Sequence, residues 1–178
     1  MVVKSLQGVI EMTTIQVELL DRVQERFEET LDKMTVEEAN KMPHPLLKSV
    51  TWLFWHTARE IDMQISDLKG EEAMYTSNGW NKRFDLPLPD DTPEYKHTSE
   101  EAEQVTVSDK DLLSDYLDVS IKLAKDYLDN LNEDTLDKIV DENWSPPVTH
   151  QARLISIIDD AVMHSGQAVY TRRLVINE

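Results

Sequence analysis

The sequence contains no cysteine. Disulfide bonds, thiolate zinc sites, iron–sulfur clusters and a cysteine nucleophile are therefore excluded. Glycine is also scarce, with four residues in the whole chain. Their spacing builds neither a G-x-G-x-x-G fingerprint nor a P-loop, and no G-x-S-x-G nucleophile elbow occurs. The common phosphate-binding loops are thus missing.

Long apolar segments are missing as well. No window approaches the roughly 18 apolar residues that cross a bilayer. Residues 1–8 lack the apolar core and the small-residue cleavage pattern of a signal peptide. We therefore expect a cytoplasmic protein with no membrane partner, and the absence of cysteine is compatible with a reducing compartment.

Basic residues are few relative to acidic ones. Lys and Arg total 18 and Asp and Glu total 35, which gives a formal net charge of −17. A chain this acidic repels phosphate backbones and anionic lipid, so we expect no nucleic-acid partner and no membrane docking. Apolar residues make up 40% of the chain, which is enough for a core. Most acidic residues are expected to lie on a solvated surface.

What the chain does contain is helical periodicity. Its length fits one domain that spans residues 1–178. Apolar residues recur at steps of three and four in four segments. These segments are residues 13–32, 46–69, 109–131 and 150–175. A long crossover, residues 71–107, links the second and third segments, so the fold class is predicted to be all-α, a four-helix bundle with a long crossover between helices 2 and 3.

Several residues are predicted to fix the helix ends. Thr35 with Glu38 resembles a capping box, and Gly70 can take a left-handed C-cap conformation. Ser108 and Thr149 are the expected N-caps of the third and fourth helices. Within the crossover we expect a short helix near residues 99–104 and a set of apolar side chains that pack the segment on the bundle: Trp80, Phe84, Leu86 and Leu88.

Three residues are candidates for chemistry. His56 and His164 lie mid-way along the second and fourth helices, and Asp160 precedes His164 by four residues, on the same helix face. Two ligands one turn apart that face a third on a neighbouring helix can bind a metal in helical bundles. Two imidazoles and one carboxylate leave positions for water or substrate. The alternative is a pair of partly buried, hydrogen-bonded histidines, and spacing alone does not decide between the two.

The other candidates have simpler interpretations. His44 is expected in a loop, and His150 at a helix start, where it assists capping or faces water. His97 is expected at the surface or at the rim of a pocket. For each of these three histidines the alternative is a position that supports the site residues from behind. Trp55 is expected in the core, with substrate stacking as the alternative. Arg172 and Arg173 suit the negative end of the last helix dipole, with anion binding as the alternative role of either.

The chain resembles the DinB-like superfamily in four motifs. Residues 55–60 (WHTARE) resemble the W-H-x-A-R motif on the second helix of that family. Residues 164–172 (HSGQAVYTR) resemble its H-x-G-Q-x-x-Y-x-R motif on the last helix. Residues 79–84 (GWNKRF) and 97–101 (HTSEE) resemble its crossover. The similarity spans residues 13–176, which is nearly the whole chain.

The resemblance implies an up-down-down-up bundle with a metal site. In the family the site uses one His on the second helix and two ligands four residues apart on the last, and these positions are His56, Asp160 and His164 here. Many members have His, and some Glu, at the position of Asp160. Zinc, nickel, iron and manganese all suit such ligands, so a divalent metal is predicted without its identity.

The resemblance also implies a class of function. The superfamily includes thiol-dependent transferases and isomerases as well as uncharacterised metal-dependent hydrolases. We therefore expect a metal-dependent enzyme with a small-molecule substrate, acting as a hydrolase or as a transferase that uses a low-molecular-weight thiol. The alternative is a non-catalytic, stress-associated binding module with a degenerate metal site, and a homodimer is the simplest expected assembly.

Overall fold

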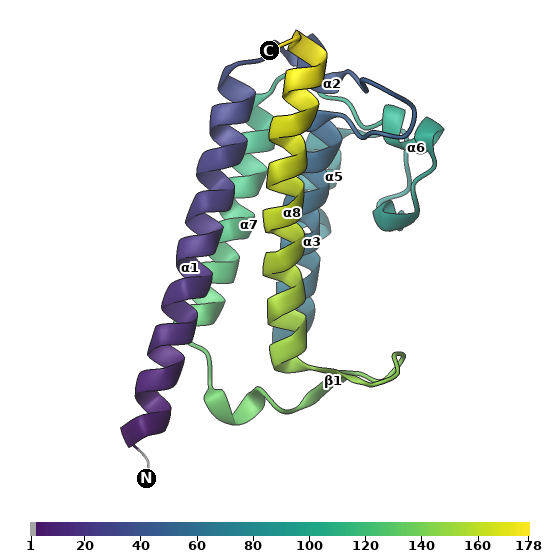
Figure 1. Cartoon of the computed structure of the whole chain (residues 1–178). Helices are drawn as coiled ribbons and strands as arrows, with labels where there is room; N and C mark the ends of the chain where they lie inside the picture. Colours follow the sequence, from purple (N-terminus) through teal and green to yellow (C-terminus); the bar gives the residue numbers. More distant parts are fainter. Residues whose placement is uncertain (1–2) are drawn as a thin grey trace.

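Four long helices form the bundle, in a computed structural model that describes the backbone of residues 3–178 and the side chains of residues 13–178. The helices are α1 (Val3–Asp32), α3 (Val50–Lys69), α7 (Asp111–Asp129) and α8 (His150–Ile176). Figure 1 shows that α1 and α8 run in one direction and that α3 and α7 run in the other. The predicted all-α fold class is confirmed. The strands of the described chain are confined to one two-stranded hairpin.

Each long helix packs against two others. Helix α3 contacts α7 and α8, and α1 contacts the same two helices from the other side. Apolar faces meet in the centre, where the rings of Phe27 and Phe54 lie 4.5 Å apart between centroids and Tyr116 is fully buried. Burial of these faces supplies most of the stability of such helices. No helix within residues 3–178 combines the length and apolar character that a membrane crossing requires.

The helix ends follow the predicted capping residues in three of four cases. Thr35 and Glu38 form a capping box before α2 (Val36–Asn40), Gly70 ends α3 at a φ of 70°, and Thr149 accepts a hydrogen bond at the start of α8. The prediction of Ser108 as the third N-cap was wrong. Helix α7 begins later because the carboxylate of Asp109 accepts the N–H of Asp111 at 3.0 Å.

Two helix starts also differ from the predicted bounds. The backbone of α1 is already helical at Val3, ahead of the predicted start at residue 13. Helix α3 begins at Val50 instead of residue 46, because the Ser49 side chain accepts the N–H of Trp52 at 3.0 Å and acts as its N-cap. A local side-chain bond of this kind sets a helix start more firmly than apolar spacing does.

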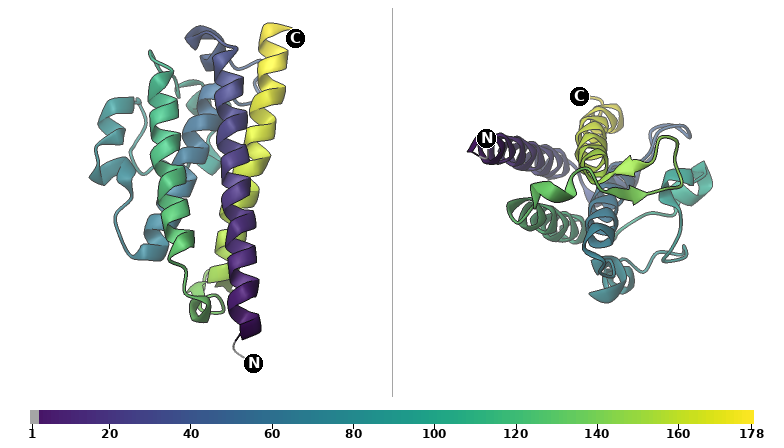
Figure 2. Two further views of the ribbon diagram at one scale, coloured as in Figure 1. Left: turned by 90° about the vertical axis from the view of Figure 1, so that its left-hand side faces the viewer. Right: turned by 90° about the horizontal axis from the view of Figure 1, so that it is seen from below.

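The crossover from residue 71 to residue 110 packs on the bundle as predicted. It contains α4 (Met74–Ser77), α5 (Trp80–Phe84), the 3-10 turn η1 (Glu94–Lys96) and α6 (Ser99–Glu103). Trp80 and Phe84 are buried, and Leu86 and Leu88 pack against the core. The left panel of Figure 2 shows these short elements on the outer side of the bundle, beside α7 and α3.

Two buried charged residues of α3 hold the crossover in place. The Asp62 carboxylate accepts the first backbone N–H groups of α4 at 2.8 and 2.7 Å, and it also accepts the hydroxyl of Tyr116 at 2.8 Å. Arg59 donates to the Glu94 carboxylate and, at 2.5 and 2.9 Å, to the carbonyl oxygens of Asp90 and Thr92. These bonds fix η1 close to the middle of α3.

The connection between α7 and α8 contains elements that the sequence analysis did not predict. It has a 3-10 turn, η2 (Glu133–Thr135), and an antiparallel hairpin of β1 (Ile139–Asp141) and β2 (Val148–Thr149). Figure 1 shows the hairpin projecting from the lower end of α8, on the same side of the bundle as α6. This position lets the hairpin and the crossover face one region of the bundle.

His150 anchors this connection and does not face water. Its side chain is buried, its Nε2 lies 2.7 Å from the hydroxyl of Tyr127, and its Nδ1 lies 2.9 Å from Oγ1 of Thr135. The predicted capping or solvent-facing role was therefore wrong. The 3-10 turn folds back over the start of α8 and covers the imidazole ring, a contact that helical periodicity does not reveal.

Candidate metal centre

His56, Asp160 and His164 converge between α3 and α8. Oδ2 of Asp160 lies 3.6 Å from Nε2 of His56, and its Oδ1 lies 3.4 Å from Nε2 of His164. The ligand atoms of the three residues all lie within 4.8 Å of one another. The four-residue spacing puts two of these side chains on one face of α8, and the packing of α8 on α3 places His56 opposite them. The structure thus brings together the three residues predicted as ligands.

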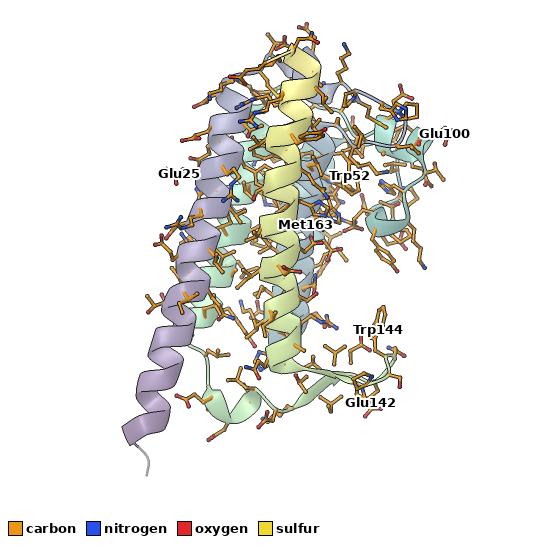
Figure 3. The ribbon with its side chains drawn as sticks, in the orientation of Figure 1. Glu25, Trp52, Glu100, Glu142, Trp144 and Met163 are labelled. Carbon is orange, nitrogen blue, oxygen red and sulfur yellow. The ribbon has the colours of Figure 1, made fainter. Side chains whose placement is uncertain are left out.

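The ring of His56 is held by Trp52, one turn earlier on α3. The two rings stack with centroids 4.5 Å apart and an interplanar angle of 13°. The indole N–H of Trp52 in turn donates to Nδ1 of His97, at 3.1 Å. Figure 3 labels Trp52 in the region between α8 and the crossover. The orientation of one candidate ligand is therefore tied to the crossover.

His97 is buried, so its predicted place at the surface or at a pocket rim was wrong, whereas the alternative, a residue that supports the site from behind, fits its bond to Trp52. Because an indole N–H can only donate, Nδ1 of His97 must accept, and the neutral ring then carries its proton on Nε2. That nitrogen lies 2.9 Å from Oγ1 of Thr92. Burial lowers the pKa of His97 despite the nearby charges of Glu101 and Glu94, which favours the neutral ring that these bonds require.

His164 is oriented from the other side by Gln167. Nδ1 of His164 lies 2.6 Å from the side-chain carbonyl oxygen of Gln167. Since a carbonyl oxygen only accepts, Nδ1 carries a proton, and in the neutral ring Nε2 is then left with its lone pair directed toward Asp160. A hydrogen bond on the remote ring nitrogen is the usual way in which proteins fix the tautomer of a metal-binding histidine.

The charges of the three residues are strongly coupled. Burial by itself would raise the pKa of Asp160, but the hydrogen bonds and charges of His164 and His56 hold it well below its ordinary value. Burial would likewise lower the pKa of His164. The hydrogen bond and charge of Asp160 outweigh burial, so the pKa of His164 is raised. The cluster therefore attracts positive charge, as a proton or as a metal ion.

The donor set fits a divalent cation. Two imidazole nitrogens and a carboxylate face one another at distances at which their lone pairs repel unless a proton or a metal ion lies between them. Three protein ligands are also the number found in catalytic zinc sites, which leave a further position for water or substrate. The residues present are thus able to hold the metal that the sequence predicts.

Glu60 is a site residue that the sequence analysis missed. It lies one turn after His56 on α3, and ligand atoms of His56, Glu60 and Glu94 also lie within 4.8 Å of one another. Gln64 donates to Glu60 at 2.5 Å. Burial and then the charge of Glu94 raise the pKa of Glu60 to about 7. Its position four residues after His56 in the WHTARE motif was a usable signal.

An open cavity of about 980 Å³ lies over these residues. His56, Glu60, Asp160 and His164 line it together with Trp52. Further walls come from three elements that are distant in the sequence: Tyr95 and Lys96 of η1, Trp144 and Val148 of the hairpin, and Ala152, Arg153 and Ser156 of α8. Tyr95 and Trp144 are 69% and 67% exposed. Figure 3 shows Trp144 on the projecting hairpin.

The remaining predicted residues lie outside the cavity. His44 is exposed in a loop as predicted, where its Nδ1 accepts the N–H of Leu46 at 3.1 Å. Trp55 is buried in the core as predicted, and its indole N–H donates to the hydroxyl of Tyr75 at 3.4 Å. Arg172 is buried and forms an ion pair with Glu178 at 2.7 Å. Its charge is therefore already engaged, which argues against the anion-binding alternative for Arg172.

The fold and the site define a helical bundle in which two long helices present a candidate metal centre to an open cavity. A family model described as DinB superfamily matches residues 19–168. The chain belongs to the DinB superfamily.

A solved structure is also closely similar. It is described as the crystal structure of the conserved protein of locus from Enterococcus faecalis, and it is 60% identical to this chain. The match covers 93% of this chain and 98% of that one, with a TM-score of 0.91. The comparison with curated proteins finds no match. These similarities establish the superfamily and the fold, and no activity is attributed to the neighbour.

Proposed function

We propose that the chain is a divalent-metal-dependent enzyme that acts on a small molecule, as a thiol-dependent transferase or as a hydrolase. The observation that carries this proposal is the convergence of His56, Asp160 and His164 in the wall of a cavity of about 980 Å³. When bound there, a divalent cation would supply Lewis acidity and lower the pKa of a bound water or thiol. Zinc, nickel, iron and manganese all suit the ligands.

Three side chains around the centre have roles that follow from their contacts. Trp52 and Gln167 hold the two imidazole rings in orientations that direct Nε2 toward Asp160. Glu60 lines the same cavity with a pKa of about 7. A carboxyl group with such a pKa exchanges its proton near neutral pH, so Glu60 can receive a proton from a group in the cavity and return it.

The cavity walls favour a substrate with an apolar body and an anionic group. Tyr95, Trp144 and Val148 provide apolar surface, and Lys96 brings a cation to the cavity. Arg153 contributes less positive charge because it pairs with Asp141 at 3.2 Å. In a chain with a net charge of −17, Lys96 is a distinctive counter-charge for a carboxylate. A small acid, or a thiol that carries a carboxylate, fits these walls.

Metal content tests the proposal directly. We expect the chain, purified without chelator, to retain close to one equivalent of a divalent metal and His56→Ala to lose it, as measured by elemental analysis. His44→Ala is a matched control, because His44 is exposed in a loop away from the centre, and it should retain the metal. Less than about a tenth of an equivalent in both the wild type and His56→Ala would support the non-catalytic alternative instead.

Activity tests the finer part of the proposal. The metal-loaded chain is incubated with a small electrophile in the presence and absence of a low-molecular-weight thiol, and thiol consumption and product formation are followed by mass spectrometry. Thiol-dependent product formation that His56→Ala abolishes supports a transferase, and water-dependent cleavage of an ester or amide panel supports a hydrolase. A metal-loaded chain that performs neither reaction contradicts the enzymatic proposal.

A further inference from the structure

One exposed face of α8 carries apolar side chains along most of its length. The four apolar residues of this face are between 43% and 61% exposed. The face has six exposed residues in all, and the steps between neighbouring ones are four, four, three, four and four positions. This spacing places them on one side of the helix. At 1.5 Å per residue the face is about 29 Å long. Its six exposed residues are Ile155, Asp159, Met163, Gly166, Tyr170 and Leu174.

The order of residues on this face is self-complementary in an antiparallel pair. Each residue has a counterpart at the same distance on the other side of a point between His164 and Ser165. A two-fold axis through that point therefore pairs large apolar side chains with one another, methionine with glycine, and a carboxylate with a phenol. It places Ile155 against the partner's Leu174, Asp159 against the partner's Tyr170, and Met163 against the partner's Gly166.

Gly166 supports a close approach at the centre of the face. A glycine within a helix is unfavourable relative to alanine, and a Cβ added at Gly166 meets nothing within 4 Å. Packing within the described chain therefore does not account for this glycine. A groove of about 560 Å³ lies beside it, lined among others by Leu46, Leu47 and Tyr170. Leu46 is 83% exposed at the groove, which leaves room for an apolar side chain of a second helix.

Charge also favours this arrangement over a random association. Two copies with a net charge of −17 each repel one another, so a stable contact needs local attraction. Asp159 and Arg173 are both exposed on this side of α8. Arg173 follows Tyr170 by three residues, so the antiparallel register brings Asp159 within reach of the partner's Arg173. Because of the two-fold symmetry, this contact between Asp159 and the partner's Arg173 occurs twice in each dimer.

We propose that α8 pairs antiparallel with α8 of a second copy of this chain, around an axis between His164 and Ser165, and that this contact forms a homodimer. The pairing of apolar with apolar residues and of Asp159 with the partner's Arg173 favours a second copy as the occupant. Figure 3 labels Met163 near the middle of this helix. Asp160 and His164 lie on the adjoining face of α8 and remain directed toward His56.

Sedimentation velocity over a concentration series tests the dimer. We expect the full-length chain to be a dimer at about 100 µM and Met163→Glu to weaken dimerisation at least about tenfold. Met63→Glu is the matched control, because Met63 is 38% exposed on α3, away from this face, and it should dimerise like the wild type. A wild-type chain that stays monomeric, or a Met63→Glu variant that loses as much affinity as Met163→Glu, overturns the proposal.

Charge reversal tests the antiparallel register. Asp159→Arg and Arg173→Asp should each weaken dimerisation about tenfold, and the double variant should recover most of the loss, because the reversed charges face one another again. Metal content is measured in parallel and should stay at the wild-type value in all three. A double variant that is weaker than both single variants contradicts the register.

The lack of cysteine permits a direct proximity test. Met163→Cys and Gly166→Cys are prepared separately, mixed and oxidised. The proposed register places these two positions opposite each other, so the mixture should form a disulfide-linked heterodimer in much higher yield than either variant alone. No cross-linking of the mixture in a sample that sediments as a dimer would show that another surface forms the contact.

Discussion

The indole ring of Trp52 lies flat against the imidazole ring of His56, with centroids 4.5 Å apart and planes inclined by 13°. The same indole donates its N–H to His97, which belongs to the crossover. One residue of α3 therefore connects a candidate ligand with a segment that lies far along the chain. This arrangement means that the crossover, besides covering the bundle, supports the geometry of the proposed metal centre.

Trp52→Phe should weaken metal binding about tenfold, as expected when a group that supports a ligand is changed. The phenyl ring keeps an aromatic surface near His56 but loses the bond to His97. Competition with a chromophoric chelator measures the affinity. Trp55→Phe is the control, because Trp55 bonds Tyr75 in the core; it should reduce stability and leave the metal affinity unchanged. Equal affinity of Trp52→Phe and wild type contradicts the supporting role.

Glu60→Gln should remove a proton-exchanging group without removing metal. We expect normal metal content, a kcat lowered about 100-fold and the loss of the ionisation near pH 7 from the pH profile, because the pKa of Glu60 is raised to about 7. The profile is measured with any substrate found by the activity screen. Glu71→Gln, at an exposed position, should keep the wild-type profile. An unchanged profile in Glu60→Gln excludes Glu60 as the proton carrier.

The stability of the metal-free chain should depend on pH through Asp160 and His164. Because the pKa of His164 is raised, its stabilisation is present below the ordinary histidine value of about 6.5 and is lost as the pH rises through the folded-state pKa. Because the pKa of Asp160 is lowered, its contribution is lost only in acid. The free energy of unfolding should therefore fall from about pH 6 to about pH 8.

Urea denaturation of chelator-treated protein at several pH values measures this dependence. Asp160→Asn should flatten the curve above pH 6, since the neutral amide no longer raises the pKa of His164. Metal affinity should change in the opposite direction and increase over the same pH range, because protons compete with the metal for His56 and His164. Parallel curves for the wild type and Asp160→Asn would show that the two residues are not coupled.

Arg59→Met should destabilise the fold by about 3–5 kcal/mol, because it leaves the buried carboxylate of Glu94 without its cation. The double variant with Glu94→Met should recover much of the loss. Arg83→Met is the control, since its ion pair with Asp115 is exposed, and it should change stability by less than about 1 kcal/mol. Urea denaturation measures all three, and equal losses at Arg59 and Arg83 would contradict the anchoring role of Arg59.

Gly166→Ala should have opposite effects on the isolated chain and on the dimer. At concentrations where the chain is monomeric, the substitution should stabilise α8 by up to about 1 kcal/mol, because alanine is the better helix former and the added Cβ meets no neighbour. Sedimentation of the same variant should show weaker dimerisation. Thermal denaturation of dilute samples measures the first effect, and an unchanged or lower midpoint would contradict it.

The sequence predicted the helices and several of their ends because these depend on local interactions. Apolar spacing decides which residues form a helix face, and Thr35, Gly70 and Thr149 act on backbone groups within a few residues. The start of α7 was misplaced because Asp109, one residue away from Ser108, supplies the competing acceptor. The superfamily motifs predicted the up-down-down-up arrangement of the helices. They also singled out His56, Asp160 and His164, whose role as metal ligands stays a prediction.

Only the tertiary structure decided what surrounds those three residues. Glu60 was close enough in the sequence to have been found, but the effect of Glu94 on its pKa depends on a contact between α3 and η1. The burial of His97 and His150 and the place of Trp144 in the cavity wall likewise depend on how two long connections fold back over the bundle. Apolar periodicity identifies the buried face of a single helix, but it does not show which other segments that helix contacts. The cavity is formed by segments that meet only after the helices have packed.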